Sequence, residues 1–321
     1  MSQTQRIQLA HLPTPIQDLP RLTAALGGPM LLLKRDDQTG LAFGGNKTRK
    51  LEYILADVQN CGARTLITGG AVQSNHCRQT AAAAAQLGLD CMLVLSGEPN
   101  KHPTGNHFLD QLFGAEIIYT TREERDSTMQ LAFDQAHAQN RKPYLIPYGG
   151  SNATGASAYA FAIQEMLSQR VEPDWIVHAT SSGGTQAGLV AGAKMYGFHG
   201  KVLGISIDET RDSLTPRVTT LATEVTEKLG AKKEIDPDHV IVNDDYLGEG
   251  YGIMGDIEKE AIRLFAQQEG ILLDPVYTGR AAAGLIHLIR SGFFSPIETV
   301  MFWHTGGTPA LLAERYHDVL E

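Results

Sequence analysis

The sequence is poor in cysteine. Its 321 residues include only Cys61, Cys77 and Cys91, and no two of these have the Cys-x-x-Cys spacing. An odd number of scattered thiols excludes a disulfide framework and argues against a zinc site. We therefore expect a protein of the reducing cytoplasm that holds no metal.

Positive charge is also scarce. The chain has 27 Lys and Arg against 36 Asp and Glu, a net charge of -9, whereas a nucleic-acid surface needs an excess of cations. The N-terminus lacks the charged start and apolar run of a signal peptide, and the other apolar stretches are interrupted by Gln, Asp, His or Gly. We expect no nucleic-acid partner and no membrane, so any anion must bind at a local site.

Two nucleotide-binding motifs are missing as well. The chain contains neither GxxxxGK[ST] nor a GxGxxG with a downstream acidic residue, and this argues against ATP and NAD as ligands. The composition, 42% hydrophobic and 20% charged, is that of an ordinary globular protein, and the length suggests about two domains.

Short apolar runs alternate with amphipathic helical patterns along the chain. The strand candidates are 30–37, 65–70, 91–97, 116–121, 144–150, 174–180, 201–208 and 299–305. The helix candidates are 46–60, 74–87, 106–113, 122–140, 154–169, 185–196 and 254–269. This alternation predicts a parallel α/β fold with ligands beyond the carboxyl ends of the strands.

The first turn that contains candidate reactive residues is GGNKTRKLEY, residues 44–53. The two glycines permit a tight turn, Asn46 can cap the helix that follows, and Lys47 stands in its first turn, with Lys50 one turn further on. The positive helix end and the neighbouring cation both lower the pKa of Lys47. A partly neutral amine forms a Schiff base with a carbonyl, so Lys47 is a candidate for that role, against the alternative of a solvated basic face.

The second turn is TGGAVQSNHCRQTAAAAA, residues 68–85. Ser74 and Asn75 stand at the head of an alanine-rich helix, where they serve either as caps or as a hydroxyl and an amide for an anionic or phenolic ligand. His76 and Arg78 are weaker candidates for contacts with a ligand.

The third turn is HATSSGGTQAG, residues 178–188. A strand runs into Thr180, Ser181, Ser182, Gly183, Gly184 and Thr185, which bring hydroxyls and main-chain amides together at a helix N-terminus. This favours phosphate binding over a purely structural turn. A Schiff-base lysine together with a phosphate cup indicates pyridoxal 5'-phosphate, which carries both an aldehyde and a phosphate.

Six segments then carry a resemblance over nearly the whole chain: LAFGGNKTRKLEY, GGAVQSNHCRQTAA, SSGGTQAG, GEGYGI, LLDPVYTGR and HTGGTPAL. They resemble the 1-aminocyclopropane-1-carboxylate deaminase and D-cysteine desulfhydrase family. The resemblance implies the tryptophan synthase β-subunit-like fold, fold type II, with two open twisted parallel-sheet domains. It implies a large cofactor domain of residues 1–51 and 158–321, a small domain of residues 52–157, and a homodimer.

The resemblance also implies roles for single residues. Lys47 would hold the cofactor covalently, Lys50 would lie near its phosphate, and Asn75 would bond the pyridine hydroxyl. Ser74, with Asn75 and His76, would contact substrate, and Tyr251 and Tyr277 would be the two active-site tyrosines. The family's phosphate loop matches Ser182, Gly183, Gly184 and Thr185.

One departure bears on the reaction. Where the deaminases have VYEGK, this chain has Thr278 in place of the acid. A hydroxyl near the pyridine nitrogen, from Thr278 with Thr305, gives a weaker electron sink than a protonated ring, which suits β-elimination better than the opening of a cyclopropane. The alternative is that Thr278 caps the next helix and positions Tyr277.

The sequence thus predicts a carbon-sulfur lyase that converts D-cysteine to pyruvate, ammonia and hydrogen sulfide. L-Cysteate sulfo-lyase is the close alternative, with His76, Arg78 and Arg280 either as sulfonate donors or as residues that face solvent. A 1-aminocyclopropane-1-carboxylate deaminase and a non-catalytic module that binds a phosphate ligand are the others. The proton acceptor for the substrate Cα, either Lys47 or a tyrosine, stays open.

Overall fold

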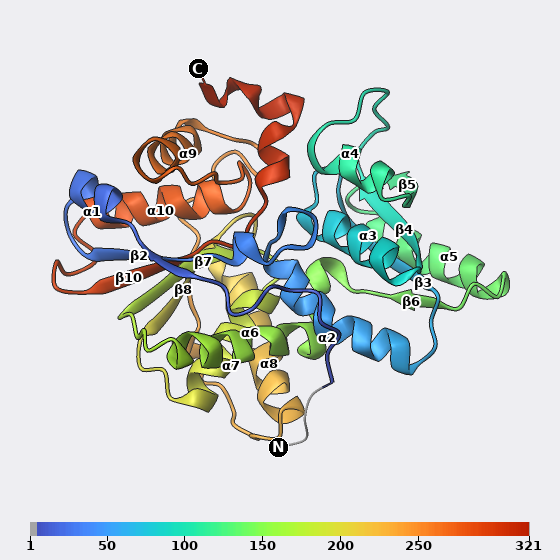
Figure 1. Cartoon of the computed structure of the whole chain (residues 1–321), viewed down its shortest axis with the longest axis horizontal. Helices are drawn as coiled ribbons and strands as arrows, with labels where there is room; N and C mark the ends of the chain where they lie inside the picture. The colour runs from blue at the N-terminus through green and yellow to red at the C-terminus, as the bar shows by residue number, and fades with distance from the viewer. Residues whose placement is uncertain (1–4, 321) are drawn as a thin grey trace.

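The computed structural model describes residues 5–320, which form two parallel sheets with helices around them (Figure 1). The larger sheet has the order β1-β2-β10-β7-β8-β9 and the smaller one β5-β4-β3-β6. All neighbouring strands run parallel except β1 and β2. The strands are β1 (Ile16–Asp18), β2 (Met30–Lys34), β3 (Thr65–Ala71), β4 (Asp90–Ser96), β5 (Glu116–Thr120), β6 (Pro143–Leu145), β7 (Trp175–Thr180), β8 (Lys201–Ser206), β9 (Ile241–Asn243) and β10 (Thr299–Trp303).

Each of the eight predicted strand segments overlaps a strand. The two that the sequence analysis did not predict, β1 and β9, have three residues each and lie at the two edges of the larger sheet. Such short edge strands are common because they limit pairing with other chains, and they are too short to give a periodic pattern.

Helices cover both faces of the larger sheet (Figure 1). One face carries α1 (Pro20–Leu26), α9 (Asp256–Glu269) and α10 (Thr278–Arg290), and the other α6 (Ala153–Ser168), α7 (Gly184–Tyr196) and α8 (Arg211–Lys228). On β10, Val300 and Phe302 pack into the first layer, whereas Met301 and Trp303 pack into the second. This burial on both faces explains the continuous apolar runs of the strands.

Two helices, α1 and α8, were not predicted, and α10 was considered only as the helix that Thr278 would cap. Helix α8 contains Pro216 and many Thr and Val residues, which have low helix propensity, yet it packs on α6 and α7 and buries Leu214, Val218, Leu221 and Val225 in that layer. Helix α1 has only seven residues. Packing therefore stabilises helices here that the local sequence favours weakly.

The smaller sheet is covered by α2 (Asn46–Asn60) and α3 (Asn75–Leu87) on one face and by α5 (Arg125–Ala138) on the other. Helix α4 (Gly105–Leu112) lies next to α3. Helix α2 also packs on α6 of the larger layer and runs unbroken through position 51, so the limits 52–157 of the small domain stay a prediction.

The remaining short turns are 3₁₀ helices: η1 (Asp36–Gln38), η2 (Leu41–Phe43), η3 (Tyr148–Gly150), η4 (Pro237–His239), η5 (Thr308–Leu312) and η6 (Glu314–Leu320). None of the helices described by the structure has the length and apolar character needed to cross a membrane.

Candidate active site

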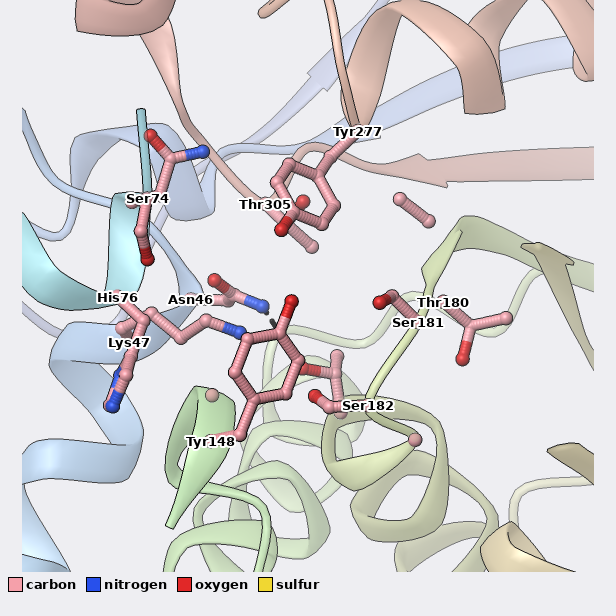
Figure 2. Close-up of a pocket in the computed structure, with 15 residues that line it drawn as sticks. Asn46, Lys47, Ser74, His76, Tyr148, Thr180, Ser181, Ser182, Tyr277 and Thr305 are labelled. Atoms are coloured by element: carbon pink, nitrogen blue, oxygen red, sulfur yellow. Dashed lines mark hydrogen bonds between the residues drawn. The ribbon is translucent and has the colours of Figure 1, made fainter. Parts of the chain in front are cut away.

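A pocket lies where the carboxyl ends of the strands of both sheets meet, and the three predicted turns contribute to it (Figure 2). It is lined by Asn46, Lys47, Ser74, Asn75, His76, Tyr148, Gly149, Ala179, Thr180, Ser181, Ser182, Gly183, Thr185, Tyr277 and Thr305. Residues as far apart in the chain as Asn46 and Thr305 thus share one site, as the parallel topology requires.

Lys47 is the second residue of α2, and its side chain points into the pocket (Figure 2). Burial lowers its pKa from 10.5 to about 8. Burial, and then the charge of Lys47, hold the pKa of Lys50 well below its usual range. The predicted direction for Lys47 is confirmed, but desolvation rather than the neighbouring cation is its cause.

Asn46 does not cap α2, contrary to the sequence prediction. The capping position belongs to Gly45, whose φ of 128° suits only glycine, and Asn46 is the first helical residue. The Asn46 main-chain N–H donates to the oxygen of Thr305 at 2.9 Å, and its Nδ2 donates to Thr185 Oγ1 at 3.0 Å. Asn46 therefore links the lysine turn to the strand end after β10 and to the phosphate cup.

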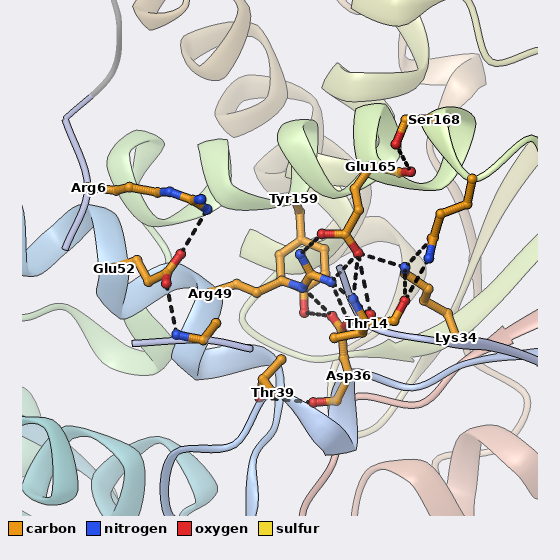
Figure 3. Close-up of polar contacts among 12 residues, drawn as sticks. Arg6, Thr14, Lys34, Asp36, Thr39, Arg49, Glu52, Tyr159, Glu165 and Ser168 are labelled. Carbon is orange, nitrogen blue, oxygen red and sulfur yellow. Dashed lines mark hydrogen bonds and ion pairs between the residues drawn. The ribbon is translucent and has the colours of Figure 1, made fainter. Parts of the chain in front are cut away.

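A buried polar network anchors α2 on the larger sheet (Figure 3). The Arg49 guanidinium donates to both carboxylate oxygens of Asp36, at 2.8 and 2.9 Å, and to both of Glu165, at 2.9 and 2.8 Å. The Asp36 carboxylate also accepts a hydrogen bond from Trp303 Nε1 at 2.8 Å. Since these partners come from β10, α6 and the turn after β2, the network fixes the helix that carries Lys47.

The predicted phosphate cup forms the N-terminus of α7. Gly183 has a left-handed φ of 83°, and no side chain caps α7. The first main-chain N–H groups of this helix are therefore available as donors beside the pocket. A Cβ on Gly184 would lie 2.5 Å from Ser151 Oγ and 2.9 Å from Lys50 Nζ. Ser182 Oγ lies 2.8 Å from Ser151 Oγ. Hydroxyls, amides and the Lys50 amine therefore converge at one place, which suits a phosphate.

Ser74 is the N-cap of α3 and accepts a hydrogen bond from the Cys77 main-chain N–H at 3.2 Å. The capping alternative for Ser74 is confirmed, and its role toward substrate stays a prediction. Asn75 Oδ1 accepts hydrogen bonds from Arg78 Nη1 at 2.9 Å and Asn106 Nδ2 at 2.8 Å. The Asn75 amide nitrogen is left as the donor toward a ligand.

His76 is buried and neutral. Its Nε2 lies 2.9 Å from Thr68 Oγ1, which itself donates to the Ile146 oxygen, so Nε2 carries the proton. Its Nδ1 is buried without a partner among the described residues. Burial, followed by the charges of Lys47 and Lys50, holds the His76 pKa well below 6.5.

Tyr251 and Tyr277 share a hydrogen bond of 2.7 Å between their hydroxyls. Tyr277 lines the pocket, whereas Tyr251 lies in the adjoining cleft. Burial, and then the neighbouring Tyr148, raise the pKa of both hydroxyls well above 10. The pair is therefore protonated at neutral pH.

Thr278 is fully buried, and its hydroxyl is engaged with Asp274. It donates to Asp274 Oδ1 at 2.8 Å and accepts from the Asp274 main-chain N–H at 2.8 Å. The same carboxylate accepts the N–H groups of Val276, Tyr277 and Thr278. Thr278 is the first residue of α10 and Tyr277 holds the cap position, so the capping part of the alternative is wrong. The Thr278 hydroxyl instead holds the Asp274 carboxylate that binds the Tyr277 N–H, and Thr305 is the threonine of the pair that lines the pocket.

The two arginines considered for a sulfonate are both committed to buried contacts. Arg280 donates to Glu258 at 2.6 Å and to four main-chain oxygens. Arg78 donates to Asn75, Asn106 and the Gly44 oxygen. The expectation that they are available for a sulfonate is therefore wrong, because both guanidinium groups are buried and donate to other parts of the protein.

Two lining residues, Tyr148 and Gly149, were missed by the sequence analysis. Both follow β6, whereas Thr180 and Ser181 belong to the predicted third turn, after β7. The rule that ligands lie at the carboxyl ends of parallel strands would have found them, had it been applied to every predicted strand.

Comparisons of this chain with known proteins agree with one another. The family described as pyridoxal-phosphate dependent enzyme matches residues 7–306. A D-cysteine desulfhydrase of Klebsiella pneumoniae (strain 342) is 42% identical over an alignment of 325 positions that covers 97% of each chain. A D-cysteine desulfhydrase of Salmonella choleraesuis (strain SC-B67) is 40% identical, again over 97% of each chain.

A solved structure, the crystal structure of an ACC deaminase homologue, matches with a TM-score of 0.90 and 38% identity, over 99% of this chain and 96% of that one. The fold class expected from the sequence, an α/β enzyme with two parallel-sheet domains of fold type II, is confirmed.

Proposed function

This chain belongs to the family of pyridoxal-phosphate dependent enzymes, and from that premise we propose that it is a D-cysteine desulfhydrase. D-Cysteine and water would give pyruvate, ammonia and hydrogen sulfide. The observation that carries the proposal is identity of 40 to 42% to D-cysteine desulfhydrases over 97% of the chain. It is supported by a pocket whose residues fit the cofactor.

The fit rests on three features of the pocket. Lys47 offers an amine of lowered pKa for the aldehyde. The N-terminus of α7, with Ser182, Thr185 and Lys50, offers donors for the phosphate. The Asn75 amide nitrogen offers a donor for the ring oxygen. When bound, pyridoxal phosphate supplies an electron sink for the carbanion at the substrate Cα.

Two groups of this chain can move protons in the reaction. The Lys47 amine, with its pKa near 8, is the better acceptor for the Cα proton at neutral pH. The Tyr251 and Tyr277 hydroxyls stay protonated because their pKa values are raised. We assign to this pair the donation of a proton to the departing sulfur. The Ser74 hydroxyl and His76 would complete the substrate side of the pocket.

The assay is a comparison of four substrates: D-cysteine, L-cysteine, L-cysteate and 1-aminocyclopropane-1-carboxylate. Pyruvate, 2-oxobutyrate, sulfide and sulfite are measured for each. Sulfide and pyruvate from D-cysteine, at a kcat/KM at least about tenfold above the other three, are expected. A preference for L-cysteate with release of sulfite would refute the proposal, as would preferred opening of the cyclopropane substrate.

We also propose that the enzyme works as a homodimer in the cytoplasm. The three cysteines, which form no disulfide with one another, support a reducing compartment. Sedimentation equilibrium of the purified protein measures the oligomeric state, and a mass near the chain mass of 34.8 kDa would rule out the dimer.

A further inference from the structure

The orientation of the Asn75 side chain is fixed by two residues that line no part of the cofactor pocket. Arg78, one turn further along α3, donates from Nη1 to Asn75 Oδ1 at 2.9 Å and to Asn106 Oδ1 at 2.6 Å. Asn106, near the start of α4, donates from Nδ2 to Asn75 Oδ1 at 2.8 Å and to the Gln73 main-chain oxygen at 2.8 Å. All three interacting side chains are buried.

The chemistry of these groups leaves one arrangement. Arginine carries only donors, so both Asn106 and Asn75 must turn their amide oxygens toward Arg78. The nitrogen of Asn106 then faces two acceptors, the Gln73 oxygen and Asn75 Oδ1. Asn75 Oδ1 is thereby occupied twice, and its Nδ2 makes no hydrogen bond within residues 5–320. The contacts with Arg78 and Asn106 therefore determine the direction in which the Asn75 amide nitrogen points.

Arg78 also reaches the other half of the site. Its Nη2 donates to the main-chain oxygen of Gly44 at 2.9 Å, in the turn directly before Lys47. Burial lowers the pKa of Arg78 to about 10, so the guanidinium still carries its charge at neutral pH. A cation next to Asn75 Oδ1 strengthens the donor at the other end of that amide.

We propose that Arg78 and Asn106 are positioning residues that turn the Asn75 amide nitrogen toward the ring oxygen of pyridoxal phosphate and set the strength of that hydrogen bond. The proposal rests on the cofactor assignment made above, and it is independent of which amino acid is the substrate. It gives α4, a helix of the smaller layer that supplies no residue to the cofactor pocket, a function in cofactor recognition.

The test compares two cofactors that differ only at the ring oxygen. Apoenzyme is titrated with pyridoxal 5'-phosphate and with 3-deoxypyridoxal 5'-phosphate, and the dissociation constants are measured by absorbance. The variants are Asn106→Ala, Arg78→Lys, Asn75→Ala and the double variants that combine Asn75→Ala with each of the first two. Arg78→Lys keeps the charge but loses the planar fork that serves Asn75, Asn106 and Gly44 together.

Asn106→Ala and Arg78→Lys are expected to weaken binding of pyridoxal phosphate by about tenfold and to change binding of the deoxy cofactor by less than about twofold. In the Asn75→Ala background neither change has a further effect on pyridoxal phosphate, because the group through which they act is gone. His107→Gln is the matched control. His107 is buried next to Asn106 on α4 and bonded to Tyr119 at 2.8 Å, and its substitution is expected to lower stability without separating the two cofactors.

Equal losses for both cofactors would make Arg78 and Asn106 merely structural, and unchanged binding of pyridoxal phosphate would remove their role altogether. Either result overturns the proposal. If Arg78→Lys does not fold, the milder Asn106→Ala decides alone. Failure of the wild-type enzyme to release sulfide from D-cysteine would refute the proposed substrate and leave this titration valid.

Discussion

The pKa of Lys47 predicts how fast the apoenzyme recaptures its cofactor at each pH. Burial lowers this pKa from 10.5 to about 8, so at about pH 7.5 about a quarter of the Lys47 amines are neutral. A lysine of ordinary pKa would be neutral in about one molecule in a thousand. Since only the neutral amine attacks an aldehyde, burial should accelerate covalent attachment by roughly two hundredfold at this pH.

The variant Lys50→Met separates the two possible causes of the lowered Lys47 pKa, which are burial and the neighbouring charge. Lys50 is buried, its own pKa is held well below 10.5, and its charge is not among the causes of the Lys47 shift. Desolvation accounts for the Lys47 shift by itself. The variant is therefore expected to bind the phosphate more weakly and to keep the Lys47 midpoint near pH 8.

Stopped-flow absorbance measures the attachment rate of saturating pyridoxal phosphate to apoenzyme from about pH 6.5 to 9.5. The expected rate rises about tenfold per pH unit below the midpoint and levels off above it, in both the wild type and Lys50→Met. A rate that keeps rising tenfold per unit through pH 9.5 would refute the lowered pKa. A midpoint that rises by a unit or more in Lys50→Met would show that the neighbouring charge, not burial, is the cause.

Three further predictions concern the scaffold and the phosphate cup. Asp36→Asn breaks the buried pair with Arg49 and should lower the free energy of unfolding by about 3 kcal/mol, measured in urea; a loss below about 1 kcal/mol would show that the network contributes little. The Asp110 carboxyl has its pKa raised well above 3.8 by burial, so its folded form holds a proton that the unfolded chain releases above pH 4. Stability should accordingly fall as pH rises above about 4, and Asp110→Asn should be more stable than wild type at pH 8 by a margin that vanishes near pH 3; equal thermal midpoints at both pH values would contradict this. Gly184→Ala places a Cβ 2.5 Å from Ser151 Oγ and should weaken pyridoxal phosphate binding at least about tenfold while leaving the thermal midpoint of the apoenzyme within a few degrees; wild-type affinity would mean that the phosphate binds elsewhere.

Sequence reasoning located the three turns of the site because each depends on local chemistry. Gly44 and Gly45 before Lys47, and the Ser-Gly-Gly-Thr run from Ser182 to Thr185, are short patterns in which neighbouring residues act together. The apolar strand runs likewise predicted a parallel α/β fold, because burial on both faces removes polar residues from the strand itself. From this fold it followed that the turns face one site.

The tertiary structure decided which polar groups are free to act. Arg280 and Arg78 look available in the sequence, but their guanidinium groups donate to buried partners within the protein, such as Glu258 and Asn106. The hydroxyl of Thr278 is likewise engaged with Asp274. Such pairings join positions far apart in the chain or depend on the direction of a single side chain, and no periodicity or motif encodes them. The sequence by itself therefore determined the fold class and the place of the site, whereas the contacts of buried side chains determined which of its residues can reach a ligand.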